Sequence, residues 1–200
     1  MKIKSLLIIL QLIFLYSCNE NKSTKIPENK VITNESKSYT FGKLYRDIGN
    51  KFRIQYPNNW DLVAGEAKHT VVKFINRDSS MSLSVNVMDN DGSMTSDKLS
   101  ETQLNDYKTQ LTSALTSANK PPVDMTVENG LLDNHNAVIT SYKFLYRQID
   151  VELLFQFYQI QSLKDGKIYN IILSAPKKYF SEIFKSYINN FLYSFMFDPE

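Results

Sequence analysis

The stretch KFRIQYPNNW, residues 51–60, contains the clearest structural signal in the chain. Its hydrophobic residues alternate with polar ones: Phe52, Ile54 and Tyr56. A period of two is typical of a strand with one buried face. Pro57 and the two asparagines after it indicate a turn, because proline cannot donate a hydrogen bond to a sheet and asparagine tolerates turn conformations. The stretch therefore predicts a half-buried strand over 51–56 that ends in a turn.

Two more strands follow, and their spacing predicts a hairpin. Thr70 to Ile75 is mostly apolar and is followed by the polar run 76–80, which favours a turn. Met81 to Met88 then alternates, with three apolar residues on one face: Leu83, Val85 and Val87. Two such runs joined by a short polar segment are typical of an antiparallel pair.

The period changes between Ser96 and Asn119. Apolar residues recur there at intervals of three and four: Leu104, Tyr107, Leu111, Ala114, Leu115 and Ala118. This spacing predicts an amphipathic helix, with Ser96 as the capping residue at its start. Pro121 and Pro122 would stop it, since proline does not continue a helix.

Four further strands are predicted: Val123 to Glu128, Ala137 to Tyr146, Val151 to Gln161 and Lys167 to Ala175. Asp165-Gly166 separates the last two, and Asp-Gly between apolar runs is a strong hairpin signal. The strand from Val151 is apolar on both faces, which predicts a place inside the sheet with cover on both sides.

A second helix is expected from Lys177 to about Tyr193. Its hydrophobic stripe consists of Phe180, Phe184, Tyr187, Ile188 and Phe191. The order of strands, helix, strands and helix predicts an α+β fold with an antiparallel central sheet and helices packed on it.

Residues 51–60 also resemble the opening of PsbP-like and DcrB-like domains, in which an apolar strand leads into Tyr-Pro, one or two polar residues and Trp. The later order of elements matches as well, over roughly residues 45–197. The resemblance implies a PsbP-like α/β/α sandwich without a shared catalytic apparatus. It also implies that Tyr56, Pro57 and Trp60 are structural signature residues, with Trp60 buried.

The N-terminus has the layout of a secretory signal over residues 1–17. Lys2 and Lys4 precede an apolar run from Leu6 to Tyr16. Eleven helical residues reach only about 16 Å, against a hydrocarbon core of roughly 30 Å, so this run is too short for a permanent membrane span.

The only cysteine, Cys18, follows Leu15-Tyr16-Ser17 at the end of this run. This resembles the lipobox of bacterial lipoproteins, although Tyr16 departs from the usual small residue. The resemblance implies that Cys18 becomes the mature N-terminus and is diacylated on sulfur and then N-acylated, as with palmitate. The alternative is a plain secretory signal with an incidental cysteine. Asn19, in place of aspartate, favours outer-membrane sorting by the rule of enteric bacteria.

Residues 19–38 are rich in Asn, Lys, Glu and Ser, and they have too little apolar surface to fold. We therefore expect lipidated Cys18 and a flexible tether over 18–38, with a root-mean-square reach of roughly 25 Å. The remaining residues, 39–200, have the size of one globular domain.

Charge and cysteine content exclude several functions. Without residues 1–17, the chain has 21 basic and 21 acidic residues. Nucleic acid is not an expected partner, because phosphate binding needs many uncompensated cations on one face. A single cysteine also excludes an internal disulfide framework and a cysteine zinc cluster.

Candidate catalytic and metal-binding residues are sparse. The only histidines are His69 and His135, and a metal site could combine His135 with Asp133, although no further ligand cluster supports it. The run Asp89 to Gly92 resembles the start of a calcium loop, but Ser100 occupies the twelfth position, where an EF-hand requires glutamate. No Gly-x-Ser-x-Gly elbow or phosphate loop is present. The sequence predicts no catalytic residue, metal or cofactor.

Three functions remain open at this point. We expect a non-catalytic, membrane-anchored envelope lipoprotein that binds or assists a protein complex. A carrier of a small apolar ligand is the alternative, with a pocket between sheet and helix lined by Phe155, Phe157 or Tyr158. A hydrolase with an unrecognised site ranks third.

Overall fold

The structure is a computed structural model, and it describes residues 41–65, 67–148, 151–179, 188, 190–191 and 194–199. The predicted signal peptide, Cys18, the tether and most of the predicted second helix lie outside these residues. In place of the start of that helix, Lys177–Tyr179 forms a short 3-10 helix, η1. Ile188, Asn190, Phe191 and Ser194 are helical.

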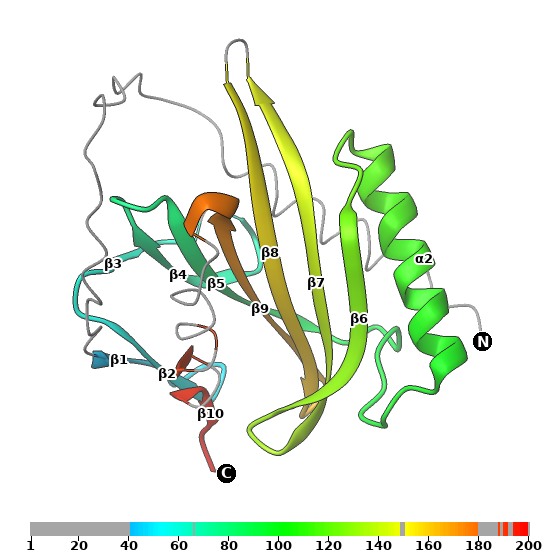
Figure 1. Cartoon of the computed structure of the whole chain (residues 1–200). Coiled ribbons are helices and arrows are strands. Elements are labelled where there is room, and N and C mark those ends of the chain that lie inside the picture. The colour runs from blue at the N-terminus through cyan, green and yellow to red at the C-terminus, as the bar shows by residue number, and fades with distance from the viewer. Residues whose placement is uncertain are drawn as a thin grey trace.

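The central element is a seven-stranded antiparallel sheet in the order β3-β4-β5-β9-β8-β7-β6 (Figure 1). Its strands are β3 (Asp61–Val63), β4 (Thr70–Asn76), β5 (Met81–Asp89), β6 (Val123–Leu132), β7 (His135–Gln148), β8 (Val151–Lys164) and β9 (Lys167–Pro176). The predicted β4–β5 hairpin is confirmed, and so is the interior position of β8 between β7 and β9. Short β3 was not predicted.

A second, three-stranded sheet has the order β1-β2-β10 and contains β1 (Phe41–Asp47), β2 (Phe52–Pro57) and β10 (Met196–Phe197). The alternation in residues 51–56 predicted β2 correctly. β10 comes from the C-terminal end of the chain and pairs with β2, where Met196 lies opposite Arg53. This sheet therefore joins the first and last described segments of the chain.

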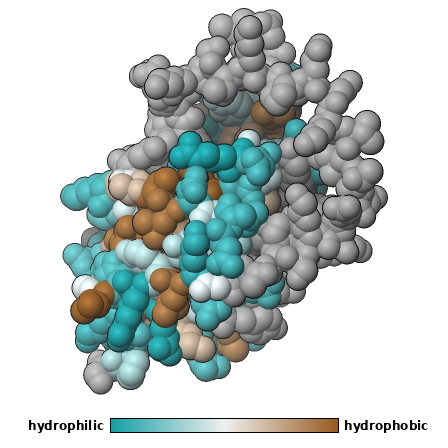
Figure 2. Space-filling view, turned by 90° about the vertical axis from the view of Figure 1, so that its left-hand side faces the viewer, coloured by the Kyte–Doolittle hydropathy of each residue, from teal (hydrophilic) through white to brown (hydrophobic). Residues whose placement is uncertain are grey.

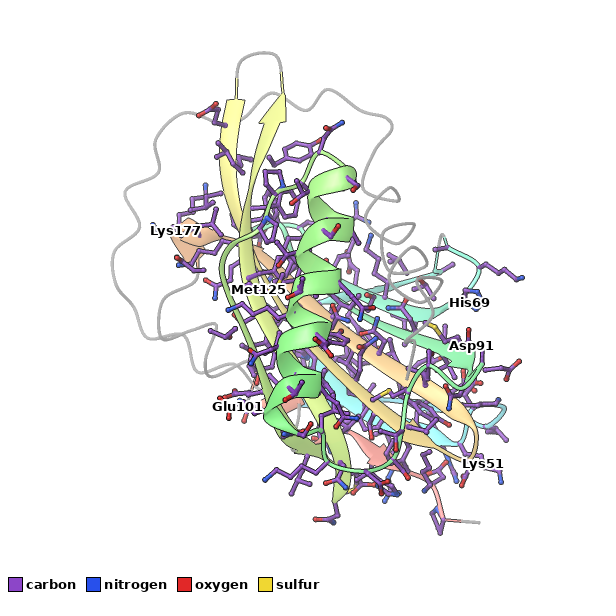
Figure 3. The ribbon with its side chains drawn as sticks, turned by 90° about the vertical axis from the view of Figure 1, so that its right-hand side faces the viewer. Lys51, His69, Asp91, Glu101, Met125 and Lys177 are labelled. Carbon is purple, nitrogen blue, oxygen red and sulfur yellow. The ribbon has the colours of Figure 1, made fainter. Side chains whose placement is uncertain are left out.

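The helix α2 (Glu101–Ser117) covers one face of the large sheet (Figure 3). Its capping residue is Ser100, whose hydroxyl accepts a hydrogen bond from the backbone of Gln103 while the Gln103 side chain bonds back to Ser100. The prediction of a cap at Ser96 was wrong. The Ser96 carbonyl accepts instead from Asn136, which holds this segment against the sheet before the helix begins.

Two tight turns set the register of the long strands. Asp165 and Gly166 both have positive φ angles, 50° and 73°, as a two-residue type I′ hairpin requires. Asp133 and Asn134, with φ angles of 46° and 64°, form a turn of the same type between β6 and β7. Asp-Gly was recognised from the sequence, and Asp133-Asn134 forms the equivalent turn.

The large sheet has a hydrophobic core on each face. One core, which includes Phe52, Phe74 and Trp60, lies between the large sheet and the second sheet. The other lies under α2 and includes Leu111, Leu115 and the stacked rings of Tyr142 and Phe157. Within the described residues, then, one face is covered by a helix and the other largely by strands. The antiparallel sheet is confirmed, and α2 supplies the helical layer on one face, while on the other face the described helical residues Ile188 and Phe191 pack beside the strands of the second sheet.

Candidate functional site

The predicted signature residues lie in the core at the end of β2. Tyr56 packs against Phe74, with ring centroids 4.5 Å apart. The backbone N–H of Trp60 donates to the carbonyl of Pro57 at 3.1 Å and closes the turn. The Trp60 side chain is fully buried and meets Phe191 edge-on at 5.4 Å, so the expected burial is confirmed. These positions give the three residues a packing role.

The structure uses Asp133 and His135 to hold the C-terminal strand. Nδ1 of His135 lies 2.7 Å from the carbonyl oxygen of Asp133, which can only accept a hydrogen bond. The Asp133 carboxylate accepts from the backbone N–H of Phe197 at 2.8 Å, and the His135 ring meets the Phe197 ring edge-on at 4.8 Å. Both residues thus contact β10 instead of converging with a third ligand.

The other acidic and histidine candidates also have local structural roles. The backbone carbonyl of His69 accepts from the N–H of Val87 at 2.9 Å beside β4. In the loop after β5, the Asp91 carboxylate accepts from the N–H of Ser93 at 3.1 Å, and the Asn90 side chain accepts from Gly92 and Met94. Within the described residues, no three His, Cys, Asp or Glu side chains come together to hold a metal ion.

A row of buried polar side chains on the α2 face of the large sheet was not predicted from the sequence. It consists of five side chains on the α2 face of β5, β7, β8 and β9, each at most 2% exposed: Asn86, Thr140, Gln159, Gln161 and Asn170. Asn170 lies opposite both Asn86 and Gln161, and Thr140 lies opposite Gln159. The Tyr107 hydroxyl of α2 donates to Gln161 at 2.7 Å. None of the five can act as a general acid or base, because amides and threonine hydroxyls do not titrate in the physiological range.

The void that the described residues line beneath the C-terminal helical residues is small. A void of about 10 Å³ lies between the large sheet and the C-terminal helical residues. Its lining comprises Leu83, Tyr158, Ile160, Ile171, Leu173, Ile188 and Phe191. Such a volume has room for about one water molecule. Tyr158 lines it as anticipated, but Phe155 and Phe157 pack on the opposite face against α2.

One part of the large sheet projects beyond the rest. β7 pairs with β6 only as far as Lys143, and β8 pairs with β9 only from Phe155. The segments 144–148 and 151–154 therefore extend past both neighbours, as Figure 1 shows, and residues 145–148 pair with residues 151–154. We call these segments the hairpin arm. Leu145 is 38% exposed on one face of the arm and Leu153 is 36% exposed on the other.

Among the described residues, no helix is long and apolar enough to cross a membrane.

Comparisons with known proteins identify the fold. No family model and no curated protein matches the sequence. The structure is similar to cyanobacterial PsbP, CyanoP, from Synechocystis, with 18% identity, a TM-score of 0.55, and coverage of 84% of this chain and 98% of that one.

Two further solved structures are similar. The Ran-binding protein Mog1p of Saccharomyces cerevisiae is 10% identical with a TM-score of 0.51, over 79% of this chain and 96% of that one. A protein from Bacteroides thetaiotaomicron is 10% identical with a TM-score of 0.50, over 80% of this chain and 50% of that one. These identities are too low to transfer an activity. The structural similarities, together with the sheet order and the helix on one face, show that the chain has a PsbP-like fold.

Proposed function

We propose that this protein is a lipid-anchored lipoprotein of the bacterial cell envelope, whose PsbP-like domain binds and assists a protein partner without catalysing a reaction. Acyl chains on Cys18 would insert into the membrane, and residues 18–38 would tether the domain. One acyl chain binds only marginally, whereas two or three hold a protein stably. Asn19 favours the outer membrane, with the domain facing the periplasm or the cell surface.

The observation that carries the binding role is the hairpin arm. A leucine is exposed on each of its faces, Leu145 and Leu153, on a ribbon that pairs with neither β6 nor β9. Exposure of these apolar side chains to water is unfavourable, and a partner with an apolar groove would bury them favourably. The arm therefore offers two partly exposed apolar side chains, one on each of its faces.

The chemistry of the described residues favours binding over catalysis. Asp133 and His135 hold β10, and the buried polar row lacks a group that titrates near neutral pH. A similar fold occurs in Mog1p, which is described as a Ran-binding protein, so a binding role on this fold has a parallel. The small void gives no comparable support to a carrier of apolar ligands.

The test is complementation of a deletion strain. We expect the intact protein to restore function, and a soluble form that begins at residue 19 behind a plain secretory signal to lose most of it, because the effective concentration at the partner falls. A double variant, Leu145→Asp with Leu153→Asp, should also fail while remaining folded, since both side chains are exposed.

Three control variants separate binding from catalysis. Leu131→Asp places the same change at a residue on β6 that is 61% exposed, and it should rescue fully. His69→Ala and His135→Ala should rescue too, provided that each remains folded. Full rescue by the soluble form, together with failure of one folded histidine variant, would overturn the proposal in favour of an enzyme.

A further inference from the structure

The second sheet has an outer face that is both basic and apolar. Tyr45, Phe52, Ile54, Phe195 and Phe197 point into the core, so strand alternation directs the residues between them outward. Three apolar side chains on or beside this face are exposed: Leu44 by 58%, Ile48 by 83% and Met196 by 40%. Figure 2 looks at the side of the molecule on which β1 lies, where hydrophobic and hydrophilic groups are interspersed.

Three cations accompany these apolar groups, namely Arg46, Lys51 and Arg53. Arg46 lies opposite Arg53 on the neighbouring strand, and Arg53 lies opposite Met196, where its guanidinium donates to the methionine sulfur at 3.4 Å. Lys51 is exposed in the turn between β1 and β2, at the periphery of the molecule in Figure 3. We call the six residues of this patch the basic-apolar face.

Among the carboxylates near the basic-apolar face, Asp198 pairs with Arg46, which leaves the charges of Lys51 and Arg53 in place. Asp198 is only 7% exposed in its side chain, and it accepts from the guanidinium of Arg46 at 2.7 Å, while the Arg46 side chain stays 58% exposed. Asp47 belongs to the other face of β1, where it accepts from the Tyr45 hydroxyl and the Asn50 N–H. Arg53 and Lys51 therefore supply a positive surface, although the mature chain as a whole is neutral.

The position of this face in the chain indicates what covers it. The first described residue, Phe41, opens β1, so the preceding segment joins the domain at the edge of the second sheet. A tether of about 20 residues that begins in a membrane keeps this sheet within roughly 25 Å of the lipid surface on average. Exposed Leu, Ile and Met beside Lys and Arg form the combination that binds an anionic bilayer interface.

We infer that the basic-apolar face docks on the surface of a bilayer that contains anionic phospholipid, and so fixes the orientation of the domain on its membrane. Arg53 and Lys51 contact the lipid phosphates, while Leu44, Ile48 and Met196 enter the headgroup region. This inference rests on the proposed lipid anchor, which holds the face close to the bilayer. The hairpin arm is part of the large sheet and the basic-apolar face is part of the second sheet, so docking leaves the arm available to the partner.

The test measures sedimentation of the unacylated chain from residue 19 with lipid vesicles. Every contact described above lies between residues 41 and 199, so the loss of residues 1–18 leaves these contacts in place. We expect binding to vesicles of phosphatidylethanolamine and phosphatidylglycerol, little binding to pure phosphatidylcholine, and weakening at high salt. The double variant Lys51→Glu with Arg53→Glu should bind about tenfold more weakly or worse, and Ile48→Asp should weaken binding several-fold.

Matched changes elsewhere are the controls. Lys108→Glu alters an exposed cation on α2, and Leu131→Asp alters an exposed leucine on β6, and both should bind vesicles as the parent chain does. The tether is common to all variants, so its own charges cancel in the comparison. Absence of binding to anionic vesicles, or an equal loss of binding in the control variants, would overturn the inference that this face docks on the bilayer. That outcome would leave acylation of Cys18 untouched, because the assay uses no acyl chain.

Discussion

The carboxylate of Asp133 accepts a hydrogen bond from the backbone N–H of Phe197 at 2.8 Å, across 64 positions of sequence. Asp133 lies in the turn between β6 and β7, and Phe197 lies in β10 of the other sheet. A residue that suggested metal binding in the sequence thus connects the two sheets. Phe197 is only 6% exposed, so its N–H has little access to water as an alternative partner.

Two substitutions of Asp133 should separate the contribution of this hydrogen bond to stability from that of the backbone conformation. Asp133 has a φ angle of 46°, which both Gly and Asn tolerate. Asp133→Gly removes the acceptor and should lower the free energy of unfolding by about 1–3 kcal/mol, whereas Asp133→Asn keeps an acceptor and should cost much less. Denaturant unfolding gives both values. Equal losses in the two variants would show that the hydrogen bond contributes nothing.

Trp60→Ala should lower the free energy of unfolding by about 3 kcal/mol or more, because it leaves a large cavity beside Phe191. Since Trp60 is the only tryptophan, its fluorescence reports on this site alone. The emission maximum of the folded chain should lie at the short wavelength typical of a buried indole. Emission at the wavelength of a water-exposed indole in the native protein is the outcome that this packing does not permit.

Asn170→Leu should stabilise the protein. Neither Nδ2 nor Oδ1 of this fully buried amide has a hydrogen-bond partner among the described residues. An unpaired buried polar group costs about 1–3 kcal/mol, so an apolar side chain of similar size should raise the free energy of unfolding.

Asn129→Leu is the matched control for this prediction. The Asn129 amide accepts from the N–H of Leu99 at 3.0 Å and donates to its carbonyl at 2.9 Å, so this substitution should destabilise. Thermal unfolding shows whether each variant is more or less stable than the parent chain. Destabilisation by both would mean that the Asn170 amide is satisfied, for example by buried water.

Stability should fall in alkaline solution because of buried tyrosines. Burial raises the pKa of Tyr142 above its ordinary value of 10.0, and the nearby Tyr107 adds to this rise. A raised pKa in the folded state means that the unfolded chain loses its proton first. The stabilising contribution is therefore complete below about pH 10 and is lost as the pH rises above it.

Tyr142→Phe should flatten this alkaline decline, since each such group adds a slope of up to about 1.4 kcal/mol per pH unit. Urea unfolding between pH 9 and 11 compares the variant with the parent chain. Burial also raises the pKa of Tyr45, Tyr158 and Tyr169, so part of the slope should remain. An unchanged slope in Tyr142→Phe would contradict the burial of that hydroxyl.

Local pattern predicted the elements that bury one continuous face. β2 and β5 alternate clearly, β4 and β9 are mostly apolar runs bounded by turn signals, and α2 has a regular three-and-four spacing, so these elements were found from the sequence. β1 was missed because Leu44 on its outer face is apolar, which hides the alternation with Tyr45. β10 was missed because two residues cannot show a period.

The buried polar row and the hairpin arm depend on contacts between distant parts of the chain, which the local spacing of residues does not show. The apolar residues on both faces of β8 predicted cover on both sides, but they did not show that Gln159 and Gln161 would be buried under α2. The hairpin arm exists because β7 and β8 are longer than β6 and β9, a property of the assembled sheet.

The most direct test of the central proposal is the intact mass of the mature protein purified from the membrane fraction of its own cells. We predict an N-terminus at Cys18 that carries a diacylglyceryl group and a further acyl chain, and loss of the protein from membranes in Cys18→Ser. An unmodified N-terminus at any other residue, or a Cys18→Ser protein that still fractionates with membranes, would contradict the lipid anchor.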